Sequence, residues 1–113
     1  MHELSLMEAV RDLALGQAAA HGAARITAIT LRIGALAGVE PEALRFAHAV
    51  VWEGTIAEGA DLVIEEVPGE CWCAPCAAPF PAEHGVCECP RCGAISRDLR
   101  QGRELQLASL ELL

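Results

Sequence analysis

Lysine is missing from this chain of 113 residues, and all eight of its basic residues are arginines. Phosphate-binding loops of the Walker type and Schiff-base enzymes both need a lysine amine, so the sequence excludes both classes. The GxGxxG pattern of dinucleotide-binding proteins and the GxSxG pattern of serine hydrolases are absent as well. No serine, histidine or cysteine stands in a context typical of a catalytic nucleophile, so we expect a protein that is not an enzyme.

Positive charge is scarce, with 16 acidic against 8 basic residues and a net charge of -8. Binding to nucleic acid needs clustered positive charge that displaces counterions, and no basic run is present, so we expect no nucleic-acid partner. Uncharged stretches stop well short of the roughly 18 residues that a membrane span requires. The chain also begins without the apolar core of a secretory signal. We therefore expect a soluble, cytoplasmic protein with no membrane partner.

Cysteine is what the chain has in abundance, with six in all. In a reducing cytoplasm we expect free thiols that bind a metal rather than disulfides. All six, together with five of the six prolines, lie within residues 68–98, which hold few large aliphatic side chains. A segment with so little apolar material does not fold by itself, so we expect a bound metal to stabilise it.

Outside this segment the hydrophobic pattern predicts two helices. The first covers residues 5–21, with Ser5 and Glu8 as a capping box and Gly22 as its C-terminal stop. Its expected buried face consists of Leu6, Val10, Leu13, Ala14 and Ala18. The second helix covers residues 41–52 and opens on a proline, which suits a first helical position.

Alternating apolar residues predict three strands, at residues 25–33, 61–67 and 103–112. These elements make an α+β fold, in which two helices pack on a three-stranded sheet and a zinc-ribbon lobe is inserted before the last strand. We expect two domains. Residues 1–67 plus 99–113 form an α/β domain, and residues 68–98 form a zinc-binding domain.

Four cysteines of the lobe have the spacing of a metal site. The pairs Cys73-Ala-Pro-Cys76 and Cys89-Pro-Arg-Cys92 are separated by twelve residues. Two residues between cysteines let both sulfurs of a pair reach one ion, and four thiolates complete a closed, structural tetrahedron that suits zinc. Gly93 should relieve the tight turn after the second pair. The spacing alone leaves a rubredoxin-like iron site as an alternative.

Two cysteines and three histidines remain outside this ligand set. Cys71 and Cys87 each precede a knuckle cysteine by two residues, and are either bystanders or ligands that exchange with their neighbours. His21 suits the C-terminal end of the first helix, where a positive charge is favourable. His48 should be half-buried and hydrogen-bonded on the apolar face of the second helix. His84 lies between the two cysteine pairs, as a solvated loop residue or as a ligand that swaps with pH or metal.

The first three residues, Met1-His2-Glu3, form a second candidate metal site. We expect the methionine to be retained, because the residue after it is not small. The terminal amine and the His2 amide nitrogen can then close a five-membered chelate ring, and that amide and the imidazole a six-membered one. A square-planar set of nitrogens suits Ni(II) or Cu(II). Taken alone, the motif is also compatible with an incidental histidine.

Further motifs run through the whole chain: Met1-His2-Glu3-Leu4-Ser5-Leu6, Leu31-Arg32-Ile33-Gly34, Gly38-Val39-Glu40-Pro41-Glu42-Ala43-Leu44-Arg45-Phe46, Glu53-Gly54-Thr55, Glu58-Gly59-Ala60, Ile64-Glu65-Glu66-Val67-Pro68, Cys89-Pro90-Arg91-Cys92-Gly93 and Gly102-Arg103-Glu104-Leu105. In this combination the chain resembles the HypA/HybF family of nickel metallochaperones, which act in the maturation of NiFe-hydrogenase. The resemblance implies a similar fold, with a nickel domain and an inserted zinc lobe.

The resemblance also implies the sites and the partners. It assigns nickel, the transferred ion, to Met1, His2 and Glu3. It assigns structural zinc to the four knuckle cysteines. Its implied partners are a HypB-type GTPase and the large subunit of NiFe-hydrogenase, and in some organisms the urease maturation proteins. This chain departs from the family pattern in the extra thiols Cys71 and Cys87.

Two functions of other classes stay open beside nickel delivery. A zinc-ribbon adaptor that only binds protein partners would hold one metal and have no use for the N-terminal motif. A rubredoxin-like electron carrier would hold a coloured, redox-active iron in the knuckles.

Overall fold

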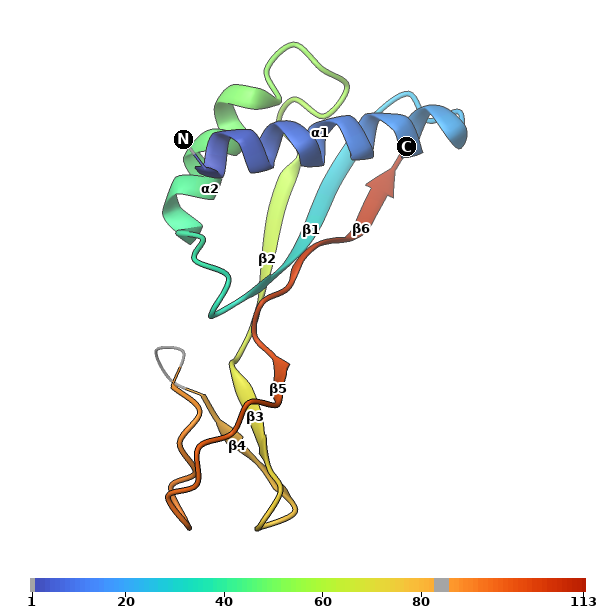
Figure 1. Cartoon of the computed structure of the whole chain (residues 1–113). Coiled ribbons are helices and arrows are strands. Elements are labelled where there is room, and N and C mark those ends of the chain that lie inside the picture. The colour runs from blue at the N-terminus through green and yellow to red at the C-terminus, as the bar shows by residue number, and fades with distance from the viewer. Residues whose placement is uncertain (1, 83–85) are drawn as a thin grey trace. The chain divides into compact units, whose positions relative to one another are not determined.

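The computed structural model describes residues 2–82 and 86–113, which form two helices and six strands (Figure 1). In chain order they are α1 (His2–Ala20), β1 (Ile26–Gly34), α2 (Pro41–Val51), β2 (Asp61–Val67), β3 (Glu70–Cys73), β4 (Ala78–Pro81), β5 (Leu99–Gln101) and β6 (Leu105–Leu112). The chain divides into two compact units. The first unit is Met1–Arg32, Val39–Glu65 and Gln106–Leu113, and the second unit is Ile33–Gly38 and Glu66–Leu105.

The helices and the sheet of order β2-β1-β6 confirm the α+β fold. The N–H of Ala24 donates to the carbonyl of Leu113 over 2.9 Å, so β1 begins where β6 ends and the two strands are antiparallel. The N–H of Ala35 donates to the carbonyl of Val67 over 2.8 Å, so β1 and β2 end together and are parallel. Helix α2 is the crossover that a parallel pair requires.

The first unit has a core of apolar side chains. Its fully buried large residues include Met7, Ile26, Ile29, Leu31, Leu44 and Trp52. Three of the residues expected to be buried on α1 are buried, namely Val10, Ala14 and Ala18. Leu13 is instead 60% exposed, because the apolar stripe of the helix runs through Met7 at spacings of three and four residues.

Helix α1 begins three residues earlier than the capping-box motif predicts. Ser5 lies inside the helix, so the predicted cap is wrong. A tertiary contact favours the longer helix, since the carboxylate of Glu3 accepts a hydrogen bond from the N–H of Glu40 at the start of α2. The predicted stop is confirmed: Gly22 has a φ of 65°, and the N–H groups of Gly22 and Ala23 donate back to the last turn, as in a Schellman motif.

The second unit contains a small antiparallel sheet of order β4-β3-β5. The sequence pattern does not predict these strands, because β3 and β4 have four residues and β5 has three, too few for a clear alternation. The buried core of this unit is Cys71, Cys73, Phe80, Ala82 and Cys89. Sulfur therefore takes much of the place that aliphatic carbon fills in the first unit.

The second unit also takes in more of the chain than the lobe at residues 68–98. Leu36, from the loop after β1, packs against the cysteine core, and its N–H donates to the carbonyl of Gly102 over 2.7 Å. Gly34 lies close to the backbone of Gly102, so that a Cβ added at Gly34 would come 2.1 Å from it. Loop residues far from the lobe in sequence thus complete its packing.

Candidate metal centre

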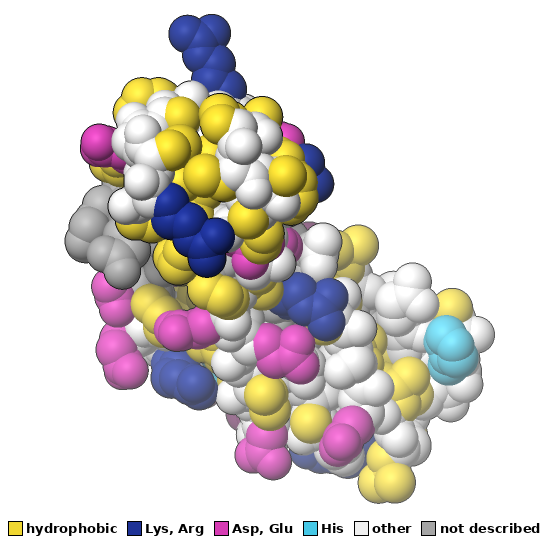
Figure 2. All heavy atoms as spheres, turned by 90° about the horizontal axis from the view of Figure 1, so that it is seen from below, with side chains coloured by type: hydrophobic (Ala, Val, Ile, Leu, Met, Phe, Trp, Pro, Cys, Tyr) yellow, Lys and Arg dark blue, Asp and Glu magenta, His cyan; other side chains and the backbone are white. Residues whose placement is uncertain are grey.

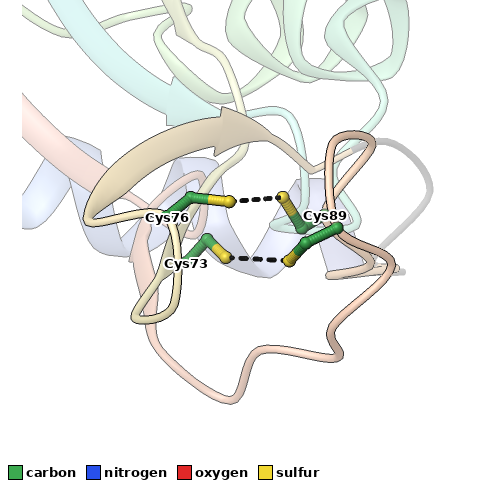
Figure 3. A group of neighbouring side chains, drawn as sticks. Cys73, Cys76 and Cys89 are labelled. Carbon is green, nitrogen blue, oxygen red and sulfur yellow. Dashed lines mark hydrogen bonds between the residues drawn. The ribbon is translucent and has the colours of Figure 1, made fainter.

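Two turns of the second unit bring four sulfur atoms together. Cys73 is the last residue of β3, and Cys76 lies on the turn that follows it. Cys89 and Cys92 lie on a second turn that faces the first (Figure 3). All four Sγ atoms lie within 4.8 Å of one another. The spacing-based prediction that these two pairs share one centre agrees with this geometry.

The distances suit a tetrahedral metal ion. Four sulfurs bound at about 2.3 Å to zinc would lie roughly 3.8 Å apart. The Sγ atoms of Cys73 and Cys92 are 3.5 Å apart, and those of Cys76 and Cys89 are 4.0 Å apart. Gly93 has a φ of 74° and donates its N–H to the carbonyl of Cys89, so it closes the second turn as predicted. A closed set of four soft ligands favours a structural ion such as zinc.

Charge is unevenly distributed over the four thiols. Hydrogen bonds from the backbone N–H groups of Cys92 and Arg91 lower the pKa of Cys89 to about 6. The neighbouring thiols of Cys73 and Cys92 raise the pKa of Cys76 to about 12. One thiolate therefore forms readily in the second turn, and further thiolates need a cation to offset their mutual repulsion. A divalent metal supplies that charge and displaces the protons.

Cys71 and Cys87 do not join the metal-binding group. They are bonded to each other in a disulfide, with Cα atoms 5.9 Å apart, a usual separation for such a bond. The expectation that all six cysteines are free thiols is therefore wrong for these two. Of the two alternatives for Cys71 and Cys87, exchange with the knuckle ligands has no support in this arrangement, because a disulfide sulfur is not a thiolate ligand.

The N-terminal motif lies at the very start of α1. Met1 lies outside the described residues, His2 is exposed and Glu3 is half-buried, both in the first helical turn. The first N–H groups of a helix have no partner within the helix, so the amide nitrogens of His2 and Glu3 are not used by the helical ladder. The expectation that these residues precede the helix is wrong, but at the helix start their amides still lie outside the helical ladder.

The carboxylate of Glu3 already has a partner. Its Oε2 accepts the N–H of Glu40 over 3.3 Å, and Glu40 is the N-cap of α2 and has no side-chain cap of its own. Hydrogen bonds from the backbone N–H groups of Glu3 itself and of Glu40 lower the pKa of the Glu3 carboxyl. Sequence reasoning missed Glu40, because nothing in its local pattern indicates that it meets the first turn of another helix.

Two of the remaining histidines, His21 and His48, belong to the first unit and are not part of the four-sulfur group. Nδ1 of His21 is 2.8 Å from the carbonyl oxygen of Gln17, at the end of α1, so it serves the helix end as expected. His48 is half-buried against Trp52, with ring centroids 5.7 Å apart, and burial lowers its pKa. Its Nε2 has no hydrogen-bond partner among the described residues, so the expected satisfied histidine is only half right. His84 lies outside the described residues.

Surface charge agrees with the low count of basic residues. On the face drawn in Figure 2, arginine side chains are scattered among acidic and apolar ones and form no continuous basic surface. In the part of the chain that the structure describes, no helix has the length and apolar character to cross a membrane.

The fold and the sulfur group together define a class: a small α+β metal-binding protein whose four-cysteine centre lies in a unit of its own. A family model described as "Hydrogenase/urease nickel incorporation, metallochaperone, hypA" matches residues 1–112. The chain belongs to this HypA family. It is accordingly a metallochaperone connected with hydrogenase maturation, and not an enzyme.

Individual relatives agree with the family over full length. Proteins named hydrogenase maturation factor HypA are 43% identical in Picosynechococcus sp. and 46% identical in Synechococcus elongatus, over 113 residues and all of each chain. The solution structure of the Ni metallochaperone HypA from Helicobacter pylori has a TM-score of 0.69 and 25% identity, covering 98% of this chain and 97% of that one. A second solution structure of a HypA protein has a TM-score of 0.70 and 26% identity, covering 100% and 97%.

Proposed function

We propose that this protein binds Ni(II) at Met1, His2 and Glu3 and delivers it during maturation of NiFe-hydrogenase, while Cys73, Cys76, Cys89 and Cys92 hold a structural Zn(II). The observation that carries the nickel site is the position of His2 and Glu3 in the first turn of α1, with amides outside the helical ladder. In this proposal the α/β domain is the nickel domain and the cysteine lobe is the zinc domain.

The donors of the nickel site are the terminal amine, the amide nitrogens and the imidazole of His2. Nickel-bound amides must lose their protons, and the positive end of the helix dipole favours the resulting negative charge. The carboxylate of Glu3 is engaged by Glu40, so Glu3 contributes its backbone nitrogen and anchors the helix start with its side chain. An exposed site of this kind can release its ion, as a donor protein must.

The zinc centre has the opposite task in this proposal. Four sulfurs leave no open coordination position, so the ion is retained and contributes to folding. The implied recipients are a HypB-type GTPase and the hydrogenase large subunit, with urease maturation proteins as further recipients where urease is present. We expect this exchange to take place in the cytoplasm.

Isothermal titration of the untagged protein with Ni(II) tests the nickel site. We expect His2→Ala to abolish tight nickel binding and to leave zinc content and folding intact. A short extension fused before Met1 should do the same, because it turns the terminal amine into an amide. Glu3→Gln should weaken binding less, since it keeps the backbone nitrogen.

His21→Ala is the matched control, because it removes an exposed histidine at the other end of the same helix. Its nickel affinity should equal that of the wild type. Unchanged nickel affinity in both His2→Ala and the extended protein would refute the delivery mechanism. The protein would then be the zinc-ribbon adaptor that binds partners without carrying nickel.

A further inference from the structure

The disulfide of Cys71 and Cys87 joins the two metal-binding turns at their bases. Cys71 is in β3, two residues before Cys73 of the first turn, and Cys87 stands two residues before Cys89 of the second. The bond closes a loop with a sequence separation of 16. It is therefore a covalent connection between the two halves of the four-sulfur group, separate from any metal.

The surroundings of the bond differ on its two sides. Cys71 is fully buried in the core of the second unit, where it lies opposite Phe80 on β4. Cys87 is only half-buried, and it lines a cavity of about 420 Å³. Cys87 is therefore the more accessible residue of the pair.

Two arginines, Arg97 and Arg103, line the same cavity beside Cys87. The ion pairs found among residues 2–82 and 86–113 use other arginines, so these two guanidinium groups form no direct ion pair with a described carboxylate. The volume lies within the range of small-molecule sites. Positive charge next to an accessible sulfur favours a small thiol or disulfide that carries carboxylates.

We propose that Cys71 and Cys87 are a reversible redox site, which exchanges with small anionic disulfides and thiols through the cavity at Cys87 and thereby controls how fast the four-cysteine centre loses its metal. In the oxidising direction the Cys87 sulfur attacks a small disulfide RSSR and releases one RSH. Cys71 then attacks the mixed disulfide at Cys87 and releases the second RSH. The protein loses two electrons and two protons, and RSSR becomes two RSH.

Reduction of the bond loosens the second turn. A hydrogen bond network through Ser96 also links the turns: its N–H donates to the carbonyl of Cys87 over 2.7 Å, and its hydroxyl donates to the carbonyl of Trp72. Hydrogen bonds break and re-form spontaneously, whereas the disulfide breaks only by exchange with a thiol, so the metal leaves faster once the covalent connection is gone. The inference rests on the knuckles holding a metal, as proposed above.

Peptide mapping of zinc-loaded, full-length protein equilibrated with oxidised and reduced glutathione tests the bond. We expect a single linkage of Cys71 to Cys87 and, in Cys71→Ser, a mixed disulfide on Cys87. In the reduced protein, zinc should pass to a chelator roughly tenfold faster than in the oxidised protein, since closing a loop of this length constrains the open state. The Cys71→Ser/Cys87→Ser variant should bind one zinc, lose it at the fast rate and ignore the reductant.

The arginine cavity is tested by the oxidation rate of the reduced protein. Arg97→Gln/Arg103→Gln should slow oxidation by glutathione disulfide about tenfold and leave oxidation by uncharged hydroxyethyl disulfide unchanged. Ser96→Ala is the control for a loosened turn. Relative to the wild type, it should speed zinc loss by the same factor in the oxidised and in the reduced protein.

The inference is overturned if the map shows disulfide linkages through Cys73 or Cys89. It is also overturned if the rate of zinc loss from the wild type does not respond to reductant. Equal slowing with both disulfides would overturn the assignment to an anionic reagent. Metal content is measured first, and absence of any knuckle metal would refute the proposed zinc centre, while the linkage map would still decide the disulfide. Failure of nickel binding leaves all of these results unaffected.

Discussion

Each of the two units of this protein is stabilised by a different kind of core. In the first unit, side chains such as Met7, Ile29 and Trp52 are fully buried and supply an apolar core. In the second unit three of the five buried core residues are cysteines, and the large apolar residue among them is Phe80. The first unit can rely on hydrophobic burial, whereas the second has too little apolar surface and needs cross-links.

The proposed metal sites follow the same division. In the second unit the four sulfurs surround a closed position, which suits an ion that stays. In the first unit His2 is exposed at a helix start, which suits an ion that is passed on. In this proposal, stability and metal exchange belong to separate parts of one short chain.

Removal of one knuckle ligand should have the largest effect. We expect Cys92→Ser to unfold the second unit, because metal binding contributes on the order of 10 kcal/mol to such small domains. The helices of the first unit should stay folded. Hydrogen exchange followed by mass spectrometry on the zinc-loaded protein measures both units at once.

Chelation of zinc from the wild type should reproduce this result without a mutation. If amides of β3 and β4 stay protected in Cys92→Ser or after chelation, the second unit does not depend on its metal. The contrast between the two units would then be wrong.

The first unit should respond to loss of carbon rather than loss of metal. Leu44 is fully buried in α2, so Leu44→Ala should lower the free energy of unfolding of this unit by about 2–5 kcal/mol. Leu13→Ala is the matched control, because Leu13 is 60% exposed. It should change the free energy of unfolding by about 0.5 kcal/mol or less. Urea unfolding monitored by the helical signal checks both, and zinc content should not change in either variant.

Two glycines should respond in opposite directions. Gly34→Ala would bring a Cβ to 2.1 Å from the backbone of Gly102, so it should destabilise the second unit by roughly 1–3 kcal/mol. Gly16 is exposed within α1 with nothing within 4 Å of an added Cβ, so Gly16→Ala should stabilise the first unit by about 1 kcal/mol. Thermal unfolding of each variant measures the sign of the change in stability. Loss of stability in both would mean that the helix does not tolerate the change either.

The smallest effect should come from the exposed pair of Asp98 and Arg100. The guanidinium donates two hydrogen bonds to the carboxylate, at 2.9 and 2.8 Å, and lowers the pKa of Asp98. A lowered pKa in the folded state means stability that is present above the ordinary aspartate pKa and lost as the pH falls through the folded value. The difference in melting midpoint between wild type and Asp98→Asn should therefore be small at neutral pH and vanish in acid. A constant difference at all pH values would contradict an electrostatic origin.

Much of the first unit could be predicted from local pattern. The stop at Gly22 and the strand at residues 61–67 are confirmed, because turn chemistry and alternation act over a few residues. The start of α1 could not be predicted in this way. Ser5 has the local signature of a cap, but the contact of Glu3 with Glu40 extends the helix past it.

The metal-binding group was predictable for a different reason. The spacing of two residues within each pair is a local constraint on which sulfurs reach one ion, and the four Sγ atoms do converge. The short strands around them carry no periodic signal, and the packing of Leu36 against the cysteines depends on contacts between distant segments. The pairing of Cys71 with Cys87 likewise depends on a contact between distant segments.

The sequence by itself determined the class of fold, the family and the four candidate sulfur ligands, because periodicity, spacing and motif are properties of neighbouring residues. Only the tertiary structure decided that α1 begins at His2, that the carboxylate of Glu3 is engaged at the start of α2, and that two cysteines pair with each other. Each of these depends on residues far apart in the chain. Their contacts form only when burial of a shared core brings the segments together.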